Sequence, residues 1–384
     1  MNKTIYADNA ATTRMKQVAL DAMKPYFTQA FGNASGMHKV AREAKTALEQ
    51  ARAEIAACIN ARPEEIYFTS GGTESDNLAL FGALEQTGKK HIVTSAVEHH
   101  AILHTCKYLE KQGVKVDYVG VDRQGFIDLG KLNQAIDGET AIVSVMYANN
   151  EIGTIMPVAK AAEIAKAKNC LFHTDAVQAV GHIPVDVQAL GVDMMSFSAH
   201  KFGGPKGIGA IYIKKGVKIK PMLHGGGHES GMRSGTENVA GAVGMATALK
   251  DAVLNMDRNI EYVSKLRDKL LDGILQIDES LITGPRENRL PGIASGCINY
   301  IEGEALIMRL DFAGICASSG SACSTASLDP SHVLLAIGLA HEVAHGSVRL
   351  SINEETTEAD VDYIIEQLKK VADTLRQMSP LWNK

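Results

Sequence analysis

The chain has 384 residues, of which 45% are hydrophobic and 22% charged, and its net charge is −5. Such a composition is typical of a globular protein, and the length favours two domains over one. The acidic balance argues against a dominant nucleic-acid surface, and no apolar run is long enough to cross a membrane. The first residues have neither a signal-peptide core nor an arginine-rich presequence, so we expect a cytoplasmic protein.

Between residues 65 and 215, short β-rich apolar runs alternate with helical patterns. Strands are predicted at 66–69, 91–96, 116–121, 141–147, 170–174, 194–197 and 209–214, with helices at 74–84, 101–111 and 158–168 among others. This alternation predicts an α/β fold, a mostly parallel seven-stranded sheet sandwiched by helices. The last two strands lie too close in sequence for a helical crossover, so we expect that pair to be antiparallel.

The remaining third of the chain predicts a smaller α+β domain. A long helix is expected from about 239 to 276, broken near 255–259, with strands in 296–325 and 348–352. We expect a helix after Asp329 and Pro330, with the aspartate as its cap. The large domain is placed at 13–257, and the small one at 1–12 and 258–384.

Polar groups follow several of the predicted strands at their carboxyl ends, where ligands collect on such sheets. After the first strand, Gly71 and Gly72 open a helix whose free N–H groups favour an anion, and Thr73 adds a hydroxyl donor. We interpret this turn as a phosphate cradle, with an ordinary helix start as the alternative. Later strands end in His99, which can stack on a planar cofactor, and in Asn150, which can bond a cofactor or a substrate carboxylate.

Asp175 and Lys201 are the most informative of these groups. Lys201 lies in a Ser-His-Lys cluster followed by glycines, and a lysine held in a partly desolvated cavity can form a Schiff base. Asp175 ends the preceding strand, with Gln178 on the same turn. A Schiff-base lysine and a carboxylate for a pyridinium nitrogen are the pair that pyridoxal phosphate (PLP) requires. A solvated surface lysine is the alternative.

Two later positions add reactive or binding groups. Cys323 stands in a small, polar, turn-rich segment, which makes it an exposed candidate nucleophile. Cys58, Cys170 and Cys316 lie in apolar settings and are interpreted as packing residues, and no Cys-x-x-Cys spacing points to zinc. Arg349 interrupts a strand and suits bidentate binding of a carboxylate, with a salt-bridged strand arginine as the alternative.

One motif points to a different chemistry. The run from His341 to His345 matches the His-Glu-x-x-His pattern of zinc proteases. Gly338 and Gly346 confine it to a couple of helical turns, and the longer metzincin pattern does not continue after it. We therefore expect no metal.

With these residues placed, the chain resembles the cysteine desulfurases of the NifS/IscS type, which are class V aminotransferase-like, fold-type I PLP enzymes. The resemblance runs from residue 6 to 382 and is carried by ordered motifs at 6–13, 69–77, 98–99, 149–153, 175–178, 198–201, 233–236 and 318–323. A PLP-free interaction protein with a vestigial site is the alternative from another class.

The resemblance implies a role for each motif. Lys201 would bind PLP covalently, Asp175 would keep its ring nitrogen protonated, Gln178 would bond its phenol oxygen, and His99 would stack on the ring. The phosphate would be held by Gly72, Thr73, Ser198 and His200 together with Thr236 of the partner subunit, which implies a homodimer.

The resemblance also implies the substrate chemistry. The carboxylate of L-cysteine would be bound by Asn33, Asn150 and Arg349, with Asn150 also beside the cofactor. Cys323 would take the sulfur as a persulfide while L-alanine leaves. Selenocysteine lyase and class V aminotransferase are the same-fold alternatives. The sulfur acceptor is open between an iron–sulfur scaffold and a tRNA-thiolation enzyme. Two runs depart from the usual patterns of the family, Asn33-Ala34-Ser35-Gly36 and residues 351–355.

Overall fold

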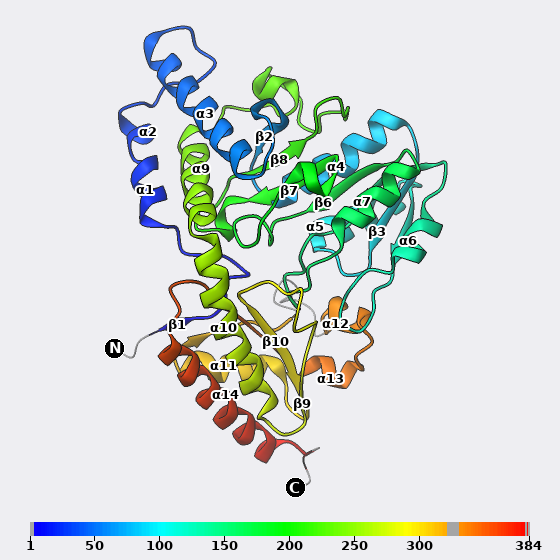
Figure 1. Cartoon of the computed structure of the whole chain (residues 1–384), viewed down its shortest axis with the longest axis vertical. Coiled ribbons are helices and arrows are strands. Elements are labelled where there is room, and N and C mark those ends of the chain that lie inside the picture. Colours follow the sequence, from blue (N-terminus) through cyan, green and yellow to red (C-terminus); the bar gives the residue numbers. More distant parts are fainter. Residues whose placement is uncertain (1–3, 321–329, 381, 383–384) are drawn as a thin grey trace.

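The computed structural model describes residues 4–320, 330–380 and 382, and Figure 1 shows two sheets joined by a long helical connection. The larger sheet has seven strands in the order β2-β8-β7-β6-β5-β3-β4. These are β2 (Ile66–Thr69), β3 (His91–Ser95), β4 (Lys115–Val119), β5 (Thr140–Ser144), β6 (Leu171–Asp175), β7 (Met194–Ser198) and β8 (Gly209–Ile213). Strands β3 to β7 are parallel, and β8 is antiparallel to both of its neighbours. The predicted fold class and the predicted antiparallel pair are confirmed.

Both faces of this sheet are covered by helices, because consecutive strand residues point to opposite sides. Ile92 and Ile142 pack with α4 (Gly72–Thr87) and α5 (His100–Glu110), whereas Val93 and Val143 belong to the core on the other face. That second face is covered by α3 (Lys39–Cys58), α7 (Val158–Ala167) and α9 (Val239–Leu254). Smaller elements of this part are α1 (Gln17–Met23), α2 (Pro25–Thr28), η1 (Pro63–Glu65), α6 (Leu129–Ala135), α8 (Val187–Leu190), η2 (Ala199–Lys201) and η3 (His228–Gly231).

The second sheet is antiparallel, in the order β12-β10-β9. Its strands are β9 (Ser280–Ile282), β10 (Ile293–Ile298) and β12 (Ser347–Ser351), packed with α10 (Met256–Leu275), α11 (Gly303–Phe312) and α14 (Glu358–Met378). The first strand, β1 (Ile5–Tyr6), pairs in parallel with β11 (Ile315–Cys316), so the chain begins in this part of the molecule. The helices α12 (His332–Ala336) and α13 (His341–His345) lie beside the second sheet.

Two local predictions were wrong in this second part. Residues 296–325 hold α11 as well as strand, because Leu306 and Leu310 are buried one helical turn apart. The cap of α12 is Ser331, whose Oγ accepts from the N–H of Val333 at 3.1 Å, so the helix begins later than Asp329 and Pro330 predict. The predicted helix break is confirmed at Asn255, between α9 and α10. The proposed domain limits, 13–257 against 1–12 and 258–384, stay a prediction.

The N-terminal segment 7–13 connects the two parts. Asn9 Nδ2 donates to Ser351 O at 2.9 Å, and Ala10 N donates to Ser351 Oγ at 2.9 Å. A few residues on, Thr13 N and Oγ1 both donate to His200 O, at 2.9 and 2.8 Å. This segment therefore holds the turn after β7 against β12. In the described part of the chain, no helix is both long and apolar enough to cross a bilayer.

Candidate active site

Lys201 lies at the end of η2, directly after the carboxyl end of β7. Its Nζ donates to Ala10 O at 2.6 Å and to Ala11 O at 2.9 Å, so the N-terminal segment holds the amine in place. The side chain is half-buried and lines a cavity of about 70 Å³ together with Gln178 and residues of the small sheet. The predicted partly desolvated lysine is therefore where the sequence suggests, and not on an open surface.

Asp175 ends the neighbouring strand β6 and is buried. Burial raises the pKa of its carboxyl to about 6, although the N–H of Val177, which Oδ1 accepts at 2.9 Å, and the charge of Lys201 both act to lower it. The carboxyl is thus a desolvated acceptor that responds to a nearby cation. Gln178 on the same turn is buried and donates from Nε2 to Ala10 O at 2.9 Å.

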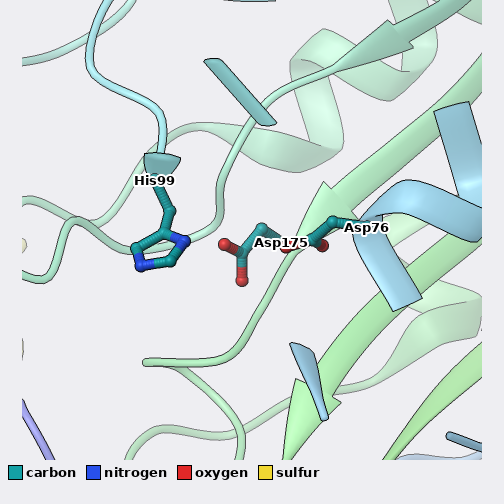
Figure 2. A group of neighbouring side chains, drawn as sticks. All are labelled: Asp76, His99 and Asp175. Carbon is teal, nitrogen blue, oxygen red and sulfur yellow. The ribbon is translucent and has the colours of Figure 1, made fainter. Parts of the chain in front are cut away.

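His99 caps α5 and faces the same place. Its Nδ1 accepts from the N–H of Ala101 at 3.1 Å, which leaves the proton of the neutral ring on Nε2. Burial and, to a smaller extent, the charges of Lys201 and His104 lower the pKa of His99 to about 4, so the ring is neutral at pH 7. Ligand atoms of Asp76, His99 and Asp175 all lie within 4.8 Å of one another (Figure 2).

The predicted phosphate cradle is a close meeting of three backbone turns. A Cβ added to Gly72 would meet Val177 Cγ2 at 2.6 Å, and one added to Gly71 would meet Ser198 Oγ at 3.6 Å. Only glycine leaves the space that opens at the start of α4. Thr73 is exposed there, and burial lowers the pKa of His200 to about 4, so its ring is a neutral group beside the cradle.

Arg349 is buried in β12, on the small-sheet side of the site. One NH2 donates to Asp8 Oδ1 at 2.9 Å and the other to Asn150 O at 3.1 Å, while Nε has no hydrogen-bond partner among the described residues. The structure thus contains the salt-bridged arginine that the sequence left open. It also leaves one buried donor unpaired, which is what a carboxylate ligand would satisfy.

Two of the predicted residues are not brought to this cluster within the one chain. Thr236 is exposed, and Asn33 is exposed with its Oδ1 accepting from Ser35 N at 2.9 Å. The loop before Thr236 is nevertheless fixed to the cradle helix, because Arg233 Nε donates to Glu74 Oε1 at 2.8 Å.

Cys323 lies outside the described residues. The chain that leads to it pairs with β12, where Ser318 and Arg349 exchange backbone hydrogen bonds of 3.2 and 2.7 Å. The last described residues before Cys323 therefore lie beside the arginine. Of the cysteines predicted to be packing residues, Cys170 is buried in the core and Cys58 packs against it, whereas Cys316 is half-buried. Burial raises the pKa of Cys58 to about 11 and that of Cys170 to about 12.

The zinc-protease pattern forms only the five-residue α13. The rings of His341 and His345 are 4.6 Å apart, and His345 Nδ1 lies 3.7 Å from Glu302 Oε2. Among the described residues, the only group of three or more side chains close enough to share an ion is Asp76, His99 and Asp175.

Sequence reasoning missed Asp76. It shares the buried face of α4 with Leu80 and Ala83, and its side chain is 1% exposed. An acidic residue on the apolar face of a helix was the available signal, because a buried carboxylate is costly without a function or a partner.

Comparison with known proteins identifies the family. The profile of the class-V aminotransferases matches residues 5–364. The chain belongs to this family. Among its members, the cysteine desulfurase IscS of Clostridium botulinum is 50% identical to the chain, over 100% of the chain and 98% of the relative. The cysteine desulfurase IscS of Methanosarcina thermophila is 48% identical, over 100% of the chain and 95% of the relative.

Solved structures of class-V aminotransferase relatives agree with the fold. A NifS-like protein superimposes with a TM-score of 0.92 at 41% identity, covering 97% of this chain and 100% of that one. The structure of SspA in complex with cysteine gives a TM-score of 0.81 at 34% identity, covering 91% of this chain and 99% of that one. The chain is therefore a class-V aminotransferase of the cysteine desulfurase group.

The cofactor of this group is pyridoxal phosphate, and the residues present fit it. Lys201 would supply the amine that binds its aldehyde, and Asp175 would supply a buried carboxylate for its ring nitrogen. The start of α4, where a side chain on Gly72 would clash with Val177, would supply the N–H groups for its phosphate.

Proposed function

We propose that the chain removes the sulfur of L-cysteine with pyridoxal phosphate, giving L-alanine and a persulfide on Cys323. The observation that carries the proposal is the buried Asp175 on β6 beside Lys201 on the next strand end, in a chain of this family. The pair supplies the two groups that the cofactor needs, one to bind it and one to keep its ring cationic.

Each residue of the site then has one task. When bound, the cofactor withdraws electrons from the substrate and so weakens the bonds around its α- and β-carbons. Lys201 and His99 are the groups that move protons there. The neutral His99 ring keeps its proton on Nε2, because Nδ1 accepts from the backbone of Ala101. Gln178 is proposed to bond the phenol oxygen of the cofactor.

The substrate is proposed to bind through its carboxylate. Arg349 offers the unpaired Nε, and Asn150 is held beside it because its carbonyl accepts from the guanidinium. Asn33 would complete this anchor. The Cys323 thiolate attacks the substrate sulfur, so that a sulfur–sulfur bond forms while the carbon–sulfur bond breaks and the carbon is protonated to alanine.

The phosphate site supports a homodimer. Gly72 and Ser198 meet at the cradle within one chain, and Thr73 and His200 are proposed to join them there. Thr236 is exposed on a loop in which Arg233 pairs with Glu74 of the cradle helix. We propose that Thr236 of the partner subunit completes the phosphate site. We further propose that the dimer works in the cytoplasm and passes sulfur to an acceptor protein, an iron–sulfur scaffold or a tRNA-thiolation enzyme.

Two variants test this proposal. Reconstitution with PLP should give absorbance near ~420 nm that Lys201→Ala abolishes, because the band needs a covalent bond to that amine. Cys323→Ser should keep the band but release no sulfide from cysteine, while Cys316→Ser, a change in a half-buried cysteine, should leave both unchanged. Undiminished sulfide release from Cys323→Ser would end the proposal.

A further inference from the structure

Two carboxyl groups lie together beneath the cofactor site. Asp76 is 1% exposed and Asp175 is 4% exposed, and their oxygens come within 4.8 Å of each other and of a His99 nitrogen. In Figure 2 the Asp76 carboxyl points from α4 toward Asp175. Two negative charges so close and so poorly hydrated repel strongly, so one of the two groups has to keep its proton.

The surroundings of the two groups are unequal. Asp175 accepts a backbone N–H from Val177 at 2.9 Å and is attracted to Lys201, and both contacts favour its charged form. Asp76 Oδ1 has no hydrogen-bond partner among the described residues, and the charged or ionisable neighbours that act on Asp76 are the carboxyl groups of Asp175 and Glu98, neither of which can offset a negative charge. Burial and these two carboxyls raise the pKa of Asp76 well above its usual range.

The basic group nearest to Asp76 does not offset this. His173 on β6 is fully buried, with Nε2 3.6 Å from Asp76 Oδ1, beyond hydrogen-bond reach. Burial lowers the pKa of His173 to about 3, so the ring is neutral. It is bonded instead to two hydroxyl groups, Ser144 Oγ at 2.9 Å on Nδ1 and Ser196 Oγ at 2.8 Å on Nε2.

This arrangement is a neutral polar chain that ends at Asp76. The Ser196 hydroxyl can donate to the Asp76 carboxyl only if His173 Nε2–H donates to Ser196, which fixes the imidazole tautomer. The chain runs along the buried face of α4 and supplies hydroxyl dipoles but no cation. It can therefore orient a carboxylic acid, but it cannot compensate a second carboxylate.

We propose that Asp76 is a positioning residue that keeps its proton during the reaction and so leaves Asp175 as the single carboxylate facing the cofactor ring. The inference rests on the role proposed above for Asp175. A neutral Asp76 fills the space behind Asp175, keeps water out of it, and does not compete for the ring nitrogen. Asp175 is then the ionised member of the pair, and its carboxylate faces the ligand.

Infrared spectroscopy of the full-length chain with PLP tests the proposal directly. A neutral carboxyl group has a carbonyl stretch separate from the carboxylate bands, and Asp76→Asn should remove one such band at pH 7. The matched control is Asp193→Asn, a partly buried aspartate whose pKa is raised by burial at the start of β7. An unchanged band in Asp76→Asn contradicts the proposal.

The pH dependence of unfolding gives a second readout, on the full-length chain without added cofactor. An unfolded aspartate ionises near pH 4, so the wild type releases a proton on unfolding wherever folded Asp76 is still protonated. From pH 5 to 7, the unfolding equilibrium constant of the wild type relative to Asp76→Asn should rise about tenfold per pH unit. A constant ratio would mean that Asp76 is already ionised when folded.

The cofactor spectrum separates this inference from the proposed function. Asp76→Asn should keep the ~420 nm band that needs the Lys201 amine, and the pH midpoint of that band should stay within about 0.3 units, because no charge is removed. A larger shift contradicts a neutral Asp76. Loss of the site itself would appear as absence of the ~420 nm band in the wild type.

If Asp76→Asn does not fold, the wild type labelled with carboxyl-¹³C aspartate replaces it in the infrared experiment. The label should shift the carbonyl stretch of the neutral carboxyl group, and no shift excludes the proposal.

Discussion

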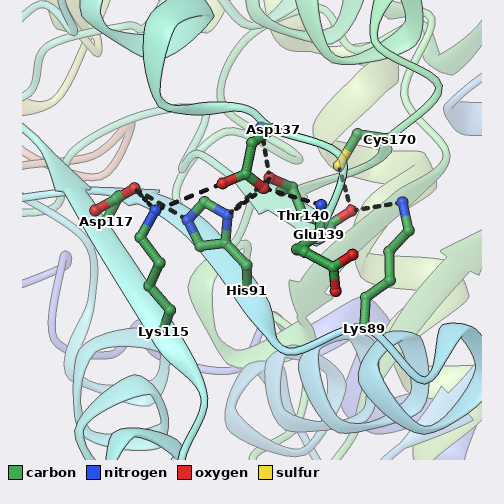
Figure 3. A network of polar contacts seen from close by, with 8 residues as sticks. All are labelled: Lys89, His91, Lys115, Asp117, Asp137, Glu139, Thr140 and Cys170. Atoms are coloured by element: carbon green, nitrogen blue, oxygen red, sulfur yellow. Dashed lines mark hydrogen bonds and ion pairs between the residues drawn. The ribbon is translucent and has the colours of Figure 1, made fainter.

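The two ends of the seven-stranded sheet differ in how fully their buried polar groups are hydrogen-bonded. At the end where β3, β4 and β5 begin, His91 is 1% exposed and both ring nitrogens are engaged (Figure 3). Nδ1 lies 3.0 Å from Asp137 Oδ1 and 2.9 Å from Thr140 Oγ1, and Nε2 lies 3.0 Å from Asp117 Oδ2. Lys115 pairs with the same carboxylates. Both ring nitrogens of His91 and the carboxylates of Asp117 and Asp137 therefore have partners supplied by the chain.

At the opposite end, several buried polar atoms lack partners. Asp76 Oδ1, Glu98 Oε2, Thr174 Oγ1 and Arg349 Nε have no hydrogen bond within the described chain. Burial raises the pKa of Glu98 to about 8, whereas hydrogen bonding to His91 lowers the pKa of Asp137 to about 2. One end is therefore organised for stability, and the other is left unsatisfied for ligands.

The largest expected effect is at the unsatisfied end. Asp175→Ala should lower kcat by about 10²-fold or more, the size of effect expected when a preorganised charge in an active site is removed. Unfolding should not become easier, because the variant also removes a desolvated carboxyl whose pKa is raised. Steady-state kinetics and urea unfolding measure the two quantities. A large loss of stability with intact kcat would place Asp175 among the structural residues.

Arg349→Lys should act on substrate binding. The lysine keeps the positive charge but lacks the planar guanidinium. In the wild type, this guanidinium reaches Asp8, and its Nε has no hydrogen-bond partner in the described chain. A charge-assisted hydrogen bond contributes about 1.5–3 kcal/mol, so KM for cysteine should rise about 10- to 100-fold with a smaller change in kcat. Asp8→Asn is the control that loosens the arginine without removing it, and its effect on KM should be smaller. Equal KM values for wild type and Arg349→Lys would exclude this arginine as the carboxylate anchor.

His91→Phe should act on stability alone. The ring shape is roughly kept, but the bonds to Asp117, Asp137 and Thr140 are lost. The free energy of unfolding should fall by about 2 kcal/mol. This is the order expected when a buried ring loses several hydrogen bonds but its former partners can still bond water. Urea unfolding measures the loss, and kcat/KM for cysteine should match the wild type. A parallel fall in activity would contradict the division between the two ends.

The smallest effect is the pH dependence contributed by Asp137, and its sign is opposite to the one expected from Asp76. Because the pKa of Asp137 is lowered from 3.8 to about 2, its contribution to stability is present above pH 4 and is lost as the pH falls through 2. The mostly exposed position of Asp137 makes this contribution small. His91→Phe should therefore weaken the pH dependence of the free energy of unfolding below pH 4. Asp76→Asn should weaken its decline above pH 5. Interchanged results would reverse the comparison.

The predicted site residues that the structure brings together are those whose position follows from a strand end. Asp175, Gln178 and Lys201 could be placed because carboxyl ends of parallel strands meet at one edge of a sheet. The partner of Arg349 could not, because Asp8 lies 341 residues away and is brought there by the pairing of the N-terminal segment with β12. Asp76 was missed because only the packing of α4 across the sheet turns its carboxyl toward Asp175. The helix α11 was missed because its short apolar pattern also suits a strand.

The segment 7–13 has a consequence for biogenesis. The carbonyls that hold the Lys201 amine belong to Ala10 and Ala11, and Ala10 is itself fixed by Ser351, close to the end of a chain of 384 residues. A ribosome therefore has to synthesise residue 351 before the contacts that hold the Lys201 amine can form. Pyridoxal phosphate should accordingly bind only after residue 351 has been synthesised. A nascent chain arrested before residue 351 should show no absorbance band of the bound cofactor.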